Sequence, residues 1–476
     1  MKRRHCRVGT EAKILIIGLS ATEEGAYERQ LGNVAILSGA TKMLKDTIPS
    51  VDISTNFQLT EAFCKELGIK SIRDKEVWSF SPSFFLKSIC DLCKCTLWRF
   101  LSLFRLDVRS LVNNRKLREY RSADIILDMS ADLFSDNFDY IRMLKHSIDI
   151  LSIRLLRKPV IIFAQSPGPF RSKFIGQVIK SILNKTTLIT TREEISKDSL
   201  LSIGVSKTPI FATACPAFLF EATSKGRVEQ IFKQEGISLD NEPLIGLTFC
   251  SFNISVNPMR IIIQNKWLNT MKYLLPKLFY NLVEKRMKSV KSLDTHVTAD
   301  LMPFAQAIDH LVERLHATVL LIPHMYESSS SRYHILSDKG LAEKLCELTN
   351  SANTEKIKIL KGKYNAEDVK GIIGECDIFI SGRMHAAIAA MTQNIPTIVI
   401  PYGNKFYGIM QMVGQQICIL EENNTDYIIS KIDYVWRKRG EISKQLEARI
   451  PEVRERALLN AKLVDDIINE KESRKV

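Results

Sequence analysis

The stretch IFISGRMHAAIAAMTQNIPTIVIPYGNKFYG, residues 378–408, decides the fold of this chain. The apolar residues at its start predict a buried strand over 376–380, and the Ser-Gly pair that follows predicts a tight turn. The alanine-rich segment after the turn predicts a helix, and residues 397–400 predict a second strand. A strand, a helix and a strand in this order are typical of a parallel sheet in an α/β fold.

Two basic side chains, Arg383 and His385, open the predicted helix just after Ser381. Backbone N–H groups at a helix N-terminus attract anions. A guanidinium can grip a carboxylate or a phosphate through two parallel hydrogen bonds, and an imidazole transfers protons near neutral pH. Lys405, in a predicted polar loop, adds positive charge. The cluster predicts a site for a small, strongly anionic ligand; the alternative is a helix start with an incidental arginine and a core histidine.

The composition is that of a globular protein with anionic partners. A length of 476 residues exceeds one ordinary core, so two domains are expected. The formal net charge of +14 favours phosphorylated substrates, acidic glycans, anionic lipid or nucleic acid. The sequence contains no zinc finger, RNP-type aromatic signature or Gly-Lys-Ser/Thr phosphate loop, so nucleic acid is not expected as a partner.

Ten cysteines are spread along the chain without regular pairing. This distribution indicates reduced thiols in a cytoplasmic protein. The tightest group, Cys90, Cys93 and Cys95, has no further His or Cys nearby to complete a zinc site, so no metal is expected. No stretch is apolar enough for long enough to span a bilayer.

Apolar runs in the first half of the chain predict strands that alternate with amphipathic helices. The predicted strands are 13–18, 51–55, 125–128, 160–165, 188–191 and 210–212. The predicted helices are 37–45, 60–67, 141–156, 173–183 and 194–203. This repetition predicts a parallel sheet covered by helices on both faces.

A polar segment, residues 221–242, interrupts this pattern, and a second series follows it. The predicted strands of the second series are 244–249, 318–323, 357–360, 378–381, 397–400 and 417–419. Its predicted helices are 303–315, 341–348 and 366–375. We therefore expect an N-terminal domain over 1–225, a C-terminal domain over 240–420 and a charged helical segment over 425–476. Two doubly wound domains that face each other would bind ligands between the carboxyl ends of their strands.

Polar side chains follow two predicted strands of the N-terminal domain. Gln165 and Ser166 precede a Pro-Gly-Pro turn, and their donors are expected to be free for a ligand. Arg192 follows strand 188–191 and is expected to be a second cation facing Arg383 across the cleft. The alternatives are a merely stiff connection at 165–169 and a local pair between Arg192 and a neighbouring glutamate.

Two further candidates have equally open interpretations. His324 follows strand 318–323 and is either a substrate contact or a structural histidine. Asp132 belongs to a group with Asp128, Asp136 and Asp139 around the end of strand 125–128. Its carboxylate is expected to bind sugar hydroxyls or act as a base, and the alternative is a solvated capping group.

Two segments stand outside the alternating pattern. Residues 75–120 mix aromatic residues with many Lys and Arg residues. That composition suits a helical hairpin packed on the sheet, which we favour, or a basic amphipathic helix on an anionic membrane. Residues 259–297, which are rich in lysine and aromatic residues, are expected to cover or receive a substrate.

Five of these motifs occur in the order seen in polysaccharide pyruvyl transferases. They are AQSPGPF (164–170), TTREEIS (190–196), IPHMY (322–326), ISGRMHAAIAAMTQNIPTIVI (380–400) and Lys405. The chain resembles this family from about residue 14 to residue 412, and the Ser-x-Arg-x-His segment is the most specific part. The resemblance implies an α/β fold with two Rossmann-like doubly wound domains in a GT-B-like arrangement.

The resemblance also implies an activity. A pyruvyl group passes from phosphoenolpyruvate to a sugar of a surface polysaccharide or its lipid-linked precursor, forming a ketal and releasing phosphate. Arg383 and His385 then look like catalytic residues of the donor site, with His385 as the acid, and Arg192 looks like a second phosphoenolpyruvate-binding arginine. The remaining predicted substrate-binding residues are Lys405, Ser381, Gln165, Ser166, His324 and Asp132.

Phosphoenolpyruvate is the donor substrate in this scheme, and neither a metal nor an organic cofactor is required. The expected partners are phosphoenolpyruvate and a saccharide acceptor that is free or lipid-linked. The expected location is the cytoplasm, with the inner face of the membrane as an alternative site of action through residues 75–120.

Three positions depart from the family pattern. Residues 30–33 read Gln-Leu-Gly-Asn where an Asn-x-Gly-Asp-like turn is common. Residues 129–132 replace a usual glycine-rich turn, and Cys215 begins the segment where Asp-Pro-Ala is expected. These departures concern acceptor binding and leave a changed substrate open, whereas Arg383 and His385 are intact.

Three other functions fit the same residues. A nucleotide-sugar glycosyltransferase of GT-B type would bind a nucleoside diphosphate and ignore phosphoenolpyruvate. A non-catalytic relative that binds anions or glycans is consistent with Asn33 and Cys215, which stand where acids are expected. A membrane-surface scaffold acting through residues 75–120 would bind anionic vesicles in a salt-sensitive way.

Overall fold

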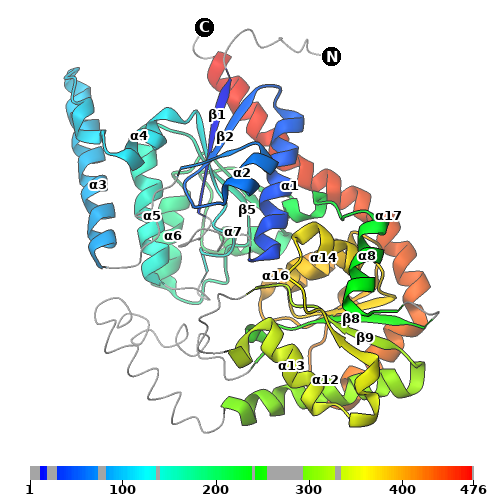
Figure 1. Ribbon diagram of the computed structural model, residues 1–476. Helices are drawn as coiled ribbons and strands as arrows, with labels where there is room; N and C mark the ends of the chain where they lie inside the picture. Colours follow the sequence, from blue (N-terminus) through cyan, green and yellow to red (C-terminus); the bar gives the residue numbers. More distant parts are fainter. Residues whose placement is uncertain are drawn as a thin grey trace. The chain divides into compact units, whose positions relative to one another are not determined.

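The chain forms two compact units, each built on its own parallel sheet (Figure 1). A computed structural model describes residues 11–18, 29–72, 82–135, 140–238, 242–254, 293–326 and 334–473. The first unit comprises Met1–Tyr27, Ser38–Ala214 and Leu458–Val476, and the second comprises Glu28–Leu37 and Cys215–Ala457. Asp136, Asp139 and most of the predicted substrate-covering segment 259–297 lie outside the described residues.

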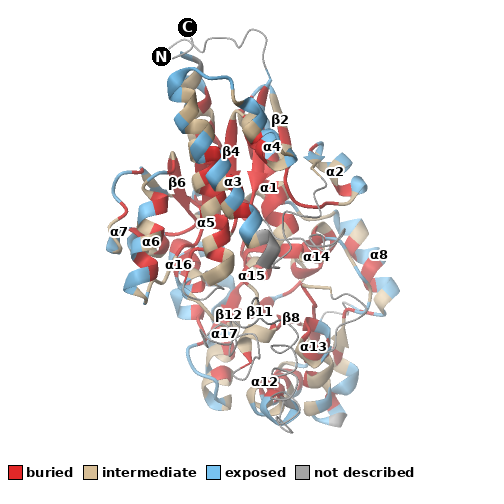
Figure 2. Cartoon of the chain, turned by 90° about the vertical axis from the view of Figure 1, so that its left-hand side faces the viewer, coloured by how far each residue is buried: buried red, intermediate tan, exposed pale blue. Residues whose placement is uncertain are grey.

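The first unit contains a seven-stranded sheet in the order β3-β2-β1-β4-β5-β6-β7, with every pair parallel. Its strands are β1 (Ala12–Ile17), β2 (Val51–Thr55), β3 (Lys70–Ser71), β4 (Ile125–Asp128), β5 (Val160–Gln165), β6 (Leu188–Thr191) and β7 (Ile210–Ala212). The strands β4, β5 and β6 are buried along their whole length, since helices cover both faces. Figure 2 labels β4 and β6, both in red.

The helices of the first unit follow its strands. They are α1 (Leu31–Thr47), α2 (Glu61–Leu67), α3 (Pro82–Leu101), α4 (Arg115–Ser122), α5 (Tyr140–Leu155), α6 (Lys173–Leu183) and α7 (Glu194–Ser202), with 3-10 turns η1 (Ser102–Phe104) and η2 (Arg109–Val112). Side-chain caps fix several starts: the hydroxyls of Thr60 and Ser172 accept from the third backbone N–H of α2 and α6. The first turns of α1, up to Leu37, group with the second unit.

The second unit contains a five-stranded parallel sheet in the order β10-β9-β8-β11-β12. Its strands are β8 (Leu244–Thr248), β9 (Thr318–Leu321), β10 (Ile357–Ile359), β11 (Ile378–Ser381) and β12 (Thr397–Val399). Its helices are α8 (Lys225–Glu235), α12 (Leu293–Leu315), α13 (Asp338–Leu348), α14 (Ala366–Ile373), α15 (Met384–Met391), α16 (Asn404–Met412) and α17 (Thr425–Ser473). Short 3-10 turns complete it: η3 (Pro216–Leu219), η4 (Ser251–Asn253), η5 (His334–Leu336), η6 (Ser351–Lys356) and η7 (Gln416–Cys418).

Three sequence predictions about secondary structure were wrong. Residues 417–419 do not form a strand: η7 occupies 416–418, and only Ile419 makes a single bridge, to Val399. Lys405 is not in a loop but in the first turn of α16. The polar segment 221–242 contains helix α8, whose buried side chains Val228, Ile231 and Phe232 are spaced for one helical face.

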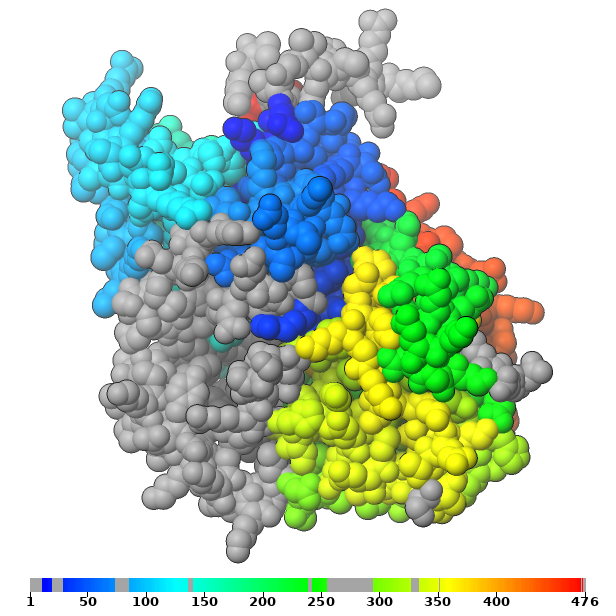
Figure 3. Space-filling view, in the orientation of Figure 1, coloured from blue at the N-terminus to red at the C-terminus, as the bar shows by residue number. Residues whose placement is uncertain are grey.

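The insertion at residues 75–120 forms helices within the first unit. Helix α3 packs against α5, and η2 packs back against α3. This arrangement confirms packing on the fold, as expected for the described part of the segment. Together α3, η1 and η2 project from the first unit, at the upper left of Figure 3. No helix among the described residues combines the length and apolar character needed to cross a bilayer.

Candidate active site

The strand order of the second sheet reverses between β8 and β11. From β8 the chain proceeds to β9 and β10 on one side, and later to β11 and β12 on the other. Ligands of open parallel sheets bind beyond the carboxyl ends of the strands at such a reversal. Cys250 and Asn253 follow β8, and Gly382 and Arg383 follow β11, so these residues lie at the expected position.

Gly382 gives the turn after β11 the room that it needs. A Cβ atom on Gly382 would overlap the side-chain amide of Asn253. Asn253 Oδ1 accepts from the Cys250 backbone N–H at 3.0 Å, and its Nδ2 donates to the Ile400 carbonyl at 3.1 Å. The Cys250 thiol donates to the Gly382 carbonyl at 3.2 Å, and burial raises the pKa of this thiol. The amide and the thiol therefore tie the ends of β8, β11 and β12 together.

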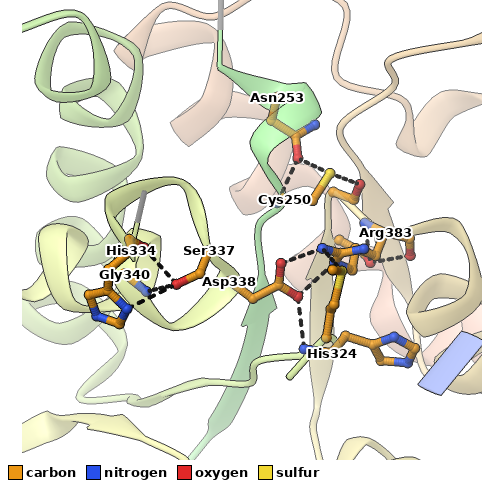
Figure 4. Close-up of polar contacts among 11 residues, drawn as sticks. Cys250, Asn253, His324, His334, Ser337, Asp338, Gly340 and Arg383 are labelled. Carbon is orange, nitrogen blue, oxygen red and sulfur yellow. Dashed lines mark hydrogen bonds and ion pairs between the residues drawn. The ribbon is translucent and has the colours of Figure 1, made fainter. Parts of the chain in front are cut away.

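Arg383 is held by a carboxylate, as Figure 4 shows. Its Nε donates to Asp338 Oδ2 at 2.6 Å, and its Nη2 makes a short contact with Asp338 Oδ1. Burial of the guanidinium opposes its charge, but the Asp338 carboxylate outweighs this effect and raises the pKa of Arg383 above its usual value. The Arg383 side chain keeps 24% of its surface exposed, against 2% for Asp338. Arg383 is therefore a permanent, oriented cation with a part of its surface open to a ligand.

Asp338 also fixes the end of β9. Its Oδ2 accepts from the backbone N–H of His324 at 3.0 Å, so one carboxylate joins Arg383 to the predicted residue His324. The imidazole of His324 is buried, and burial together with the charge of Arg383 lowers its pKa to about 3. His324 is thus a neutral imidazole at ordinary pH, suited to hydrogen bonding rather than to acid catalysis.

His385 lies in the first turn of α15, against the first turn of α1. A Cβ atom on Gly32 would come within 2.6 Å of His385 Nδ1, so the glycine is needed for the imidazole to fit. The side chain of His385 is half-buried. Ser381 is fully buried: its Oγ donates to the Arg383 carbonyl at 2.8 Å and accepts from the Arg383 N–H at 3.2 Å. The hydroxyl of Ser381 thus shapes the turn that presents Arg383.

Lys405 lies in the first turn of α16 over an aromatic ring. Its Nζ is 4.9 Å from the centroid of the Tyr402 ring, a cation–π distance. Tyr402 in turn stacks on Phe252 at 5.0 Å and meets Phe406 edge-on at 4.9 Å. The aromatic group positions the lysine near the carboxyl end of β12, and its role in substrate binding stays a prediction.

The first sheet has its own reversal, between β1 and β4, and Asp128 lies at it. Asp128 is fully buried, and its Oδ1 accepts from the Ser130 N–H at 3.1 Å and lies 2.9 Å from His146 Nε2. The expectation that Gln165 and Ser166 have free donors was wrong for both residues. Gln165 Nε2 donates to the Asp128 carbonyl at 2.7 Å, and its Oε1 accepts from Ser130 Oγ at 3.2 Å. Gln165 therefore braces the ends of β4 and β5.

Ser166 and Arg192 lie together, also in the first unit. Arg192 Nε donates to Ser166 Oγ at 3.1 Å, and Ser166 Oγ donates to Glu193 Oε2 at 3.0 Å. All three residues are buried. Glu193, one of the neighbouring glutamates expected only as an alternative partner for Arg192, orients Ser166 instead.

Asp132 is half-buried in the turn after β4, and its backbone carbonyl accepts from Ser135 Oγ at 2.9 Å. The same turn is held by the backbone N–H of Ser166, which donates to the Ala131 carbonyl at 2.9 Å. The role of Asp132 toward a sugar stays a prediction. Across the described residues, no three His, Cys, Asp or Glu side chains group closely enough to hold a metal ion.

Asp338 is the residue that sequence reasoning missed. It stands in the stretch Ser337-Asp338-Lys339-Gly340, where Ser337 caps α13 through a 2.8 Å bond from the Gly340 N–H. A capping serine followed by an acid is a normal helix start, so the sequence held no sign that this acid reaches Arg383. The Gly32 contact with His385 was also missed, because residues 30–33 were interpreted as a changed acceptor turn.

The solved structures that resemble this α/β fold are GT-B glycosyltransferases and UDP-GlcNAc 2-epimerases. HepE of Anabaena, solved in complex with UDP and glucose, aligns with a TM-score of 0.54 at 11% identity, covering 96% of this chain and 100% of that one. A glycosyltransferase of Rickettsia africae aligns with a TM-score of 0.55 at 14% identity, covering 97% and 99%. At such identities the likeness shows the fold alone, and it confirms the two doubly wound α/β domains.

The sequence comparisons give the family. The family model of polysaccharide pyruvyl transferases matches residues 31–404. The amylovoran biosynthesis protein AmsJ of Erwinia amylovora is 22% identical over 355 residues, which are 74% of each chain. This chain belongs to the polysaccharide pyruvyl transferase family, as its motifs predicted.

Proposed function

We propose that this protein transfers a pyruvyl group from phosphoenolpyruvate to two hydroxyls of one sugar in a surface polysaccharide or its lipid-linked precursor. The product is a cyclic ketal, and phosphate is released. Membership of the family supports a transferase of this kind. The observation that carries the choice of donor is Arg383, an oriented cation at the N-terminus of α15, at the reversal of the second sheet.

The donor fits this arrangement by its charge. Phosphoenolpyruvate carries a carboxylate and a phosphate, and both are groups that arginine binds through parallel hydrogen bonds. Asp338 holds the Nε and Nη2 side of Arg383, and among the described residues Nη1 makes no hydrogen bond or ion pair. The first N–H groups of α15 supply further donors with a favourable helix dipole. In this proposal Nη1 and those N–H groups bind one anionic group of the donor.

The proposed reaction has two steps. In the first, a sugar hydroxyl adds to C2 while the methylene carbon C3 receives a proton and becomes a methyl group. His385 gives that proton and regains one from the attacking hydroxyl. In the second, the neighbouring hydroxyl displaces phosphate from C2, and its proton leaves with the phosphate. The charge of Arg383 stabilises the phosphate as it departs.

The other predicted residues keep narrower roles. Asp338 is a positioning residue, because it acts through Arg383. His324 offers a neutral imidazole beside it. Arg192 lies in the first unit, and its part in donor binding stays a prediction, as do those of Lys405, Ser166 and Asp132. The proposed chemistry uses no metal or organic cofactor, and cytoplasmic location also stays a prediction.

Titration calorimetry with phosphoenolpyruvate tests the donor. Wild-type protein is expected to bind it, and Arg383→Lys is expected to bind at least about tenfold more weakly, since lysine keeps the charge but loses the planar fork. The double change Arg383→Ala with Asp338→Ala removes both charges without leaving a buried carboxylate unpaired, and it should abolish binding. Addition of a sugar acceptor then reports turnover as released phosphate.

Arg227 provides the matched control in the same unit. It pairs with Asp368 through Nε and Nη2 at 3.4 and 3.2 Å and so joins α8 to α14. Arg227→Lys should leave phosphoenolpyruvate binding unchanged. Binding of UDP in place of phosphoenolpyruvate would instead support the glycosyltransferase alternative and overturn the proposal. Phosphoenolpyruvate binding without phosphate release from any acceptor would favour a non-catalytic relative.

A further inference from the structure

The projecting segment of the first unit carries an unusual share of the exposed apolar side chains. Twelve large hydrophobic residues are exposed among the described residues, and six of them lie between positions 86 and 106. Five of the six form what we call the apolar tip: Leu97, Phe100, Leu103, Phe104 and Leu106. Leu103 and Phe104 are the most exposed, at 64% and 63%. Gathered apolar side chains of this kind mark an interaction surface.

Helix α3 exposes an apolar stripe on its outer side. Its exposed stripe is Leu86, Cys90, Cys93, Leu97 and Phe100, at intervals of 4, 3, 4 and 3 residues, which place them on one helical face. The inner side carries the buried residues Ser88, Asp91 and Cys95 and the partly buried Trp98, so two of its four positions are polar. A helix that only covered a sheet would show the opposite distribution, because burial favours apolar side chains. The outward stripe therefore needs an apolar environment of its own.

The segment that carries the apolar tip is rich in exposed basic side chains. The exposed charged residues between 86 and 118 are Lys87, Lys94, Arg105, Arg109, Arg115, Arg118 and Asp107. Six positive charges against one negative charge give this surface a formal charge of +5. Asp107 lies 3.6 Å from Arg109, so even the single acid is paired. Apolar side chains accompanied by lysine and arginine match the chemistry of an anionic lipid surface.

A buried ionic network fixes this surface to the first unit. Lys116 Nζ lies 2.5 Å from Asp149 Oδ1 on α5 and 3.5 Å from Asp91 Oδ2 on α3. Asn114 Nδ2 donates to Asp91 Oδ1 at 2.7 Å. Polar contacts on the inner side of α3 therefore fix which of its faces is exposed.

We propose that the apolar tip inserts into the headgroup region of an anionic lipid bilayer, with Arg105, Arg109 and the neighbouring lysines pairing with lipid phosphates. This inference stands on the surface of the first unit alone and does not rest on the proposed function. Phe100 and Phe104, in edge-to-face contact at 5.3 Å, form the part that enters deepest.

Vesicle flotation tests the proposal with the full-length protein. Wild type is expected to float with vesicles of phosphatidylcholine and phosphatidylglycerol, weakly or not at all with phosphatidylcholine alone, and less at high salt. Phe100→Ser with Phe104→Ser should weaken binding by at least about tenfold. Arg105→Gln with Arg109→Gln should weaken it by about 30-fold, at about fivefold per arginine.

The matched control is Phe174→Ser with Phe211→Ser, two exposed phenylalanines elsewhere in the first unit, which should bind vesicles like wild type. All four changed phenylalanines are exposed, so circular dichroism should be unchanged. Wild type that does not float with anionic vesicles overturns the proposal. It is also overturned if the variant Phe100→Ser with Phe104→Ser floats like wild type. A third outcome overturns it too: wild type sediments as a dimer and this variant as a monomer, since a second copy would then cover the tip.

Discussion

At the end of β9, the buried imidazole of His324 lies near the partly exposed guanidinium of Arg383. Burial and the charge of Arg383 lower the pKa of His324 to about 3, against 6.5 in an unfolded chain. Between pH 3 and pH 6.5, the His324 imidazole therefore binds a proton in the unfolded state but not in the folded state. The contribution of His324 to stability is therefore complete above pH 6.5 and is lost as the pH falls toward 3.

We expect the free energy of unfolding to fall by about 2 kcal/mol from this residue between pH 7.5 and pH 5. His324→Gln should remove that part of the pH dependence, and urea unfolding at the two pH values measures it. His296→Gln, at an exposed histidine of α12, is the control and should keep the wild-type dependence. An unchanged slope in His324→Gln would show that the imidazole is protonated in the folded protein.

At the residue scale, the sequence identified cations better than their partners. Arg383 and His385 could be located because a helix start after a buried strand is a local pattern. Asp338 could not, since its contact with Arg383 joins residues 45 positions apart and depends on how α13 approaches the sheet. Gln165 was placed correctly at a strand end, but its bonds to Asp128 and Ser130 depend on the neighbouring strand.

At the scale of elements, Lys116 links three helices of the first unit. Burial opposes its charge, but Asp149 and Asp91 raise its pKa, and Lys116 and Lys145 hold the pKa of the buried Asp149 well below its usual range. Lys116→Met leaves two buried carboxylates short of a partner. We expect the free energy of unfolding to drop by about 3–5 kcal/mol, measured by urea unfolding at pH 7.

The exposed pair between Lys70 and Asp52, at 2.8 Å, is the control for this change. Lys70→Met should cost less than about 1 kcal/mol, because a solvent-exposed ion pair contributes little. Adding Asp149→Asn to Lys116→Met should recover part of the loss. If Lys116→Met were no worse than Lys70→Met, the network would not be what fixes α3 on α5.

Elements with continuous apolar runs were predicted most accurately. The bounds of β2, β4, β5, β6, β7 and α6 match the predicted ranges. Burial along the whole strand explains β4, β5 and β6, and a regular apolar face explains α6, whereas β2 and β7 are only partly buried. Helix α8 was missed because only three of its residues are buried. Helix α16 was missed because its glycines and asparagine are typical of a loop.

In the whole molecule, the order of the segments along the chain does not match their division between the two units. The sequence predicts a separate helical segment over 425–476, since its pattern is continuous and charged. In the structure the single helix α17 is shared: its residues to Ala457 group with the second unit, and those from Leu458 group with the first. Periodicity along a helix cannot show this division, because it gives the buried face but not the element that covers it.

The shared helix leads to a prediction about the first unit. Asn460 is fully buried, accepts from Thr213 Oγ1 at 2.9 Å and donates to the Ala214 carbonyl at 3.0 Å, while Lys471 Nζ donates to the Asp124 carbonyl at 2.9 Å. Removal of residues 458–476 takes these bonds away and exposes the surface covered by Val464 and Ile468, at about 1.5–3 kcal/mol for each side chain. We expect the first unit to unfold at a lower temperature and to become sensitive to limited proteolysis at β7.

Two smaller changes distinguish the loss of these contacts from an effect of shortening the chain. Removal of residues 474–476 alone should leave the unfolding temperature unchanged. Asn460→Ala should lower stability by about 1–3 kcal/mol, because it removes the side-chain donor to the buried Ala214 carbonyl, while the Thr213 hydroxyl keeps its bond to the Thr191 carbonyl at 2.9 Å. If the protein without residues 458–476 and the Asn460→Ala variant both unfolded like wild type, the last turns of α17 would not contribute to the stability of the first unit. The first unit would then be complete within residues that precede Cys215, which its buried contacts with Asn460 argue against.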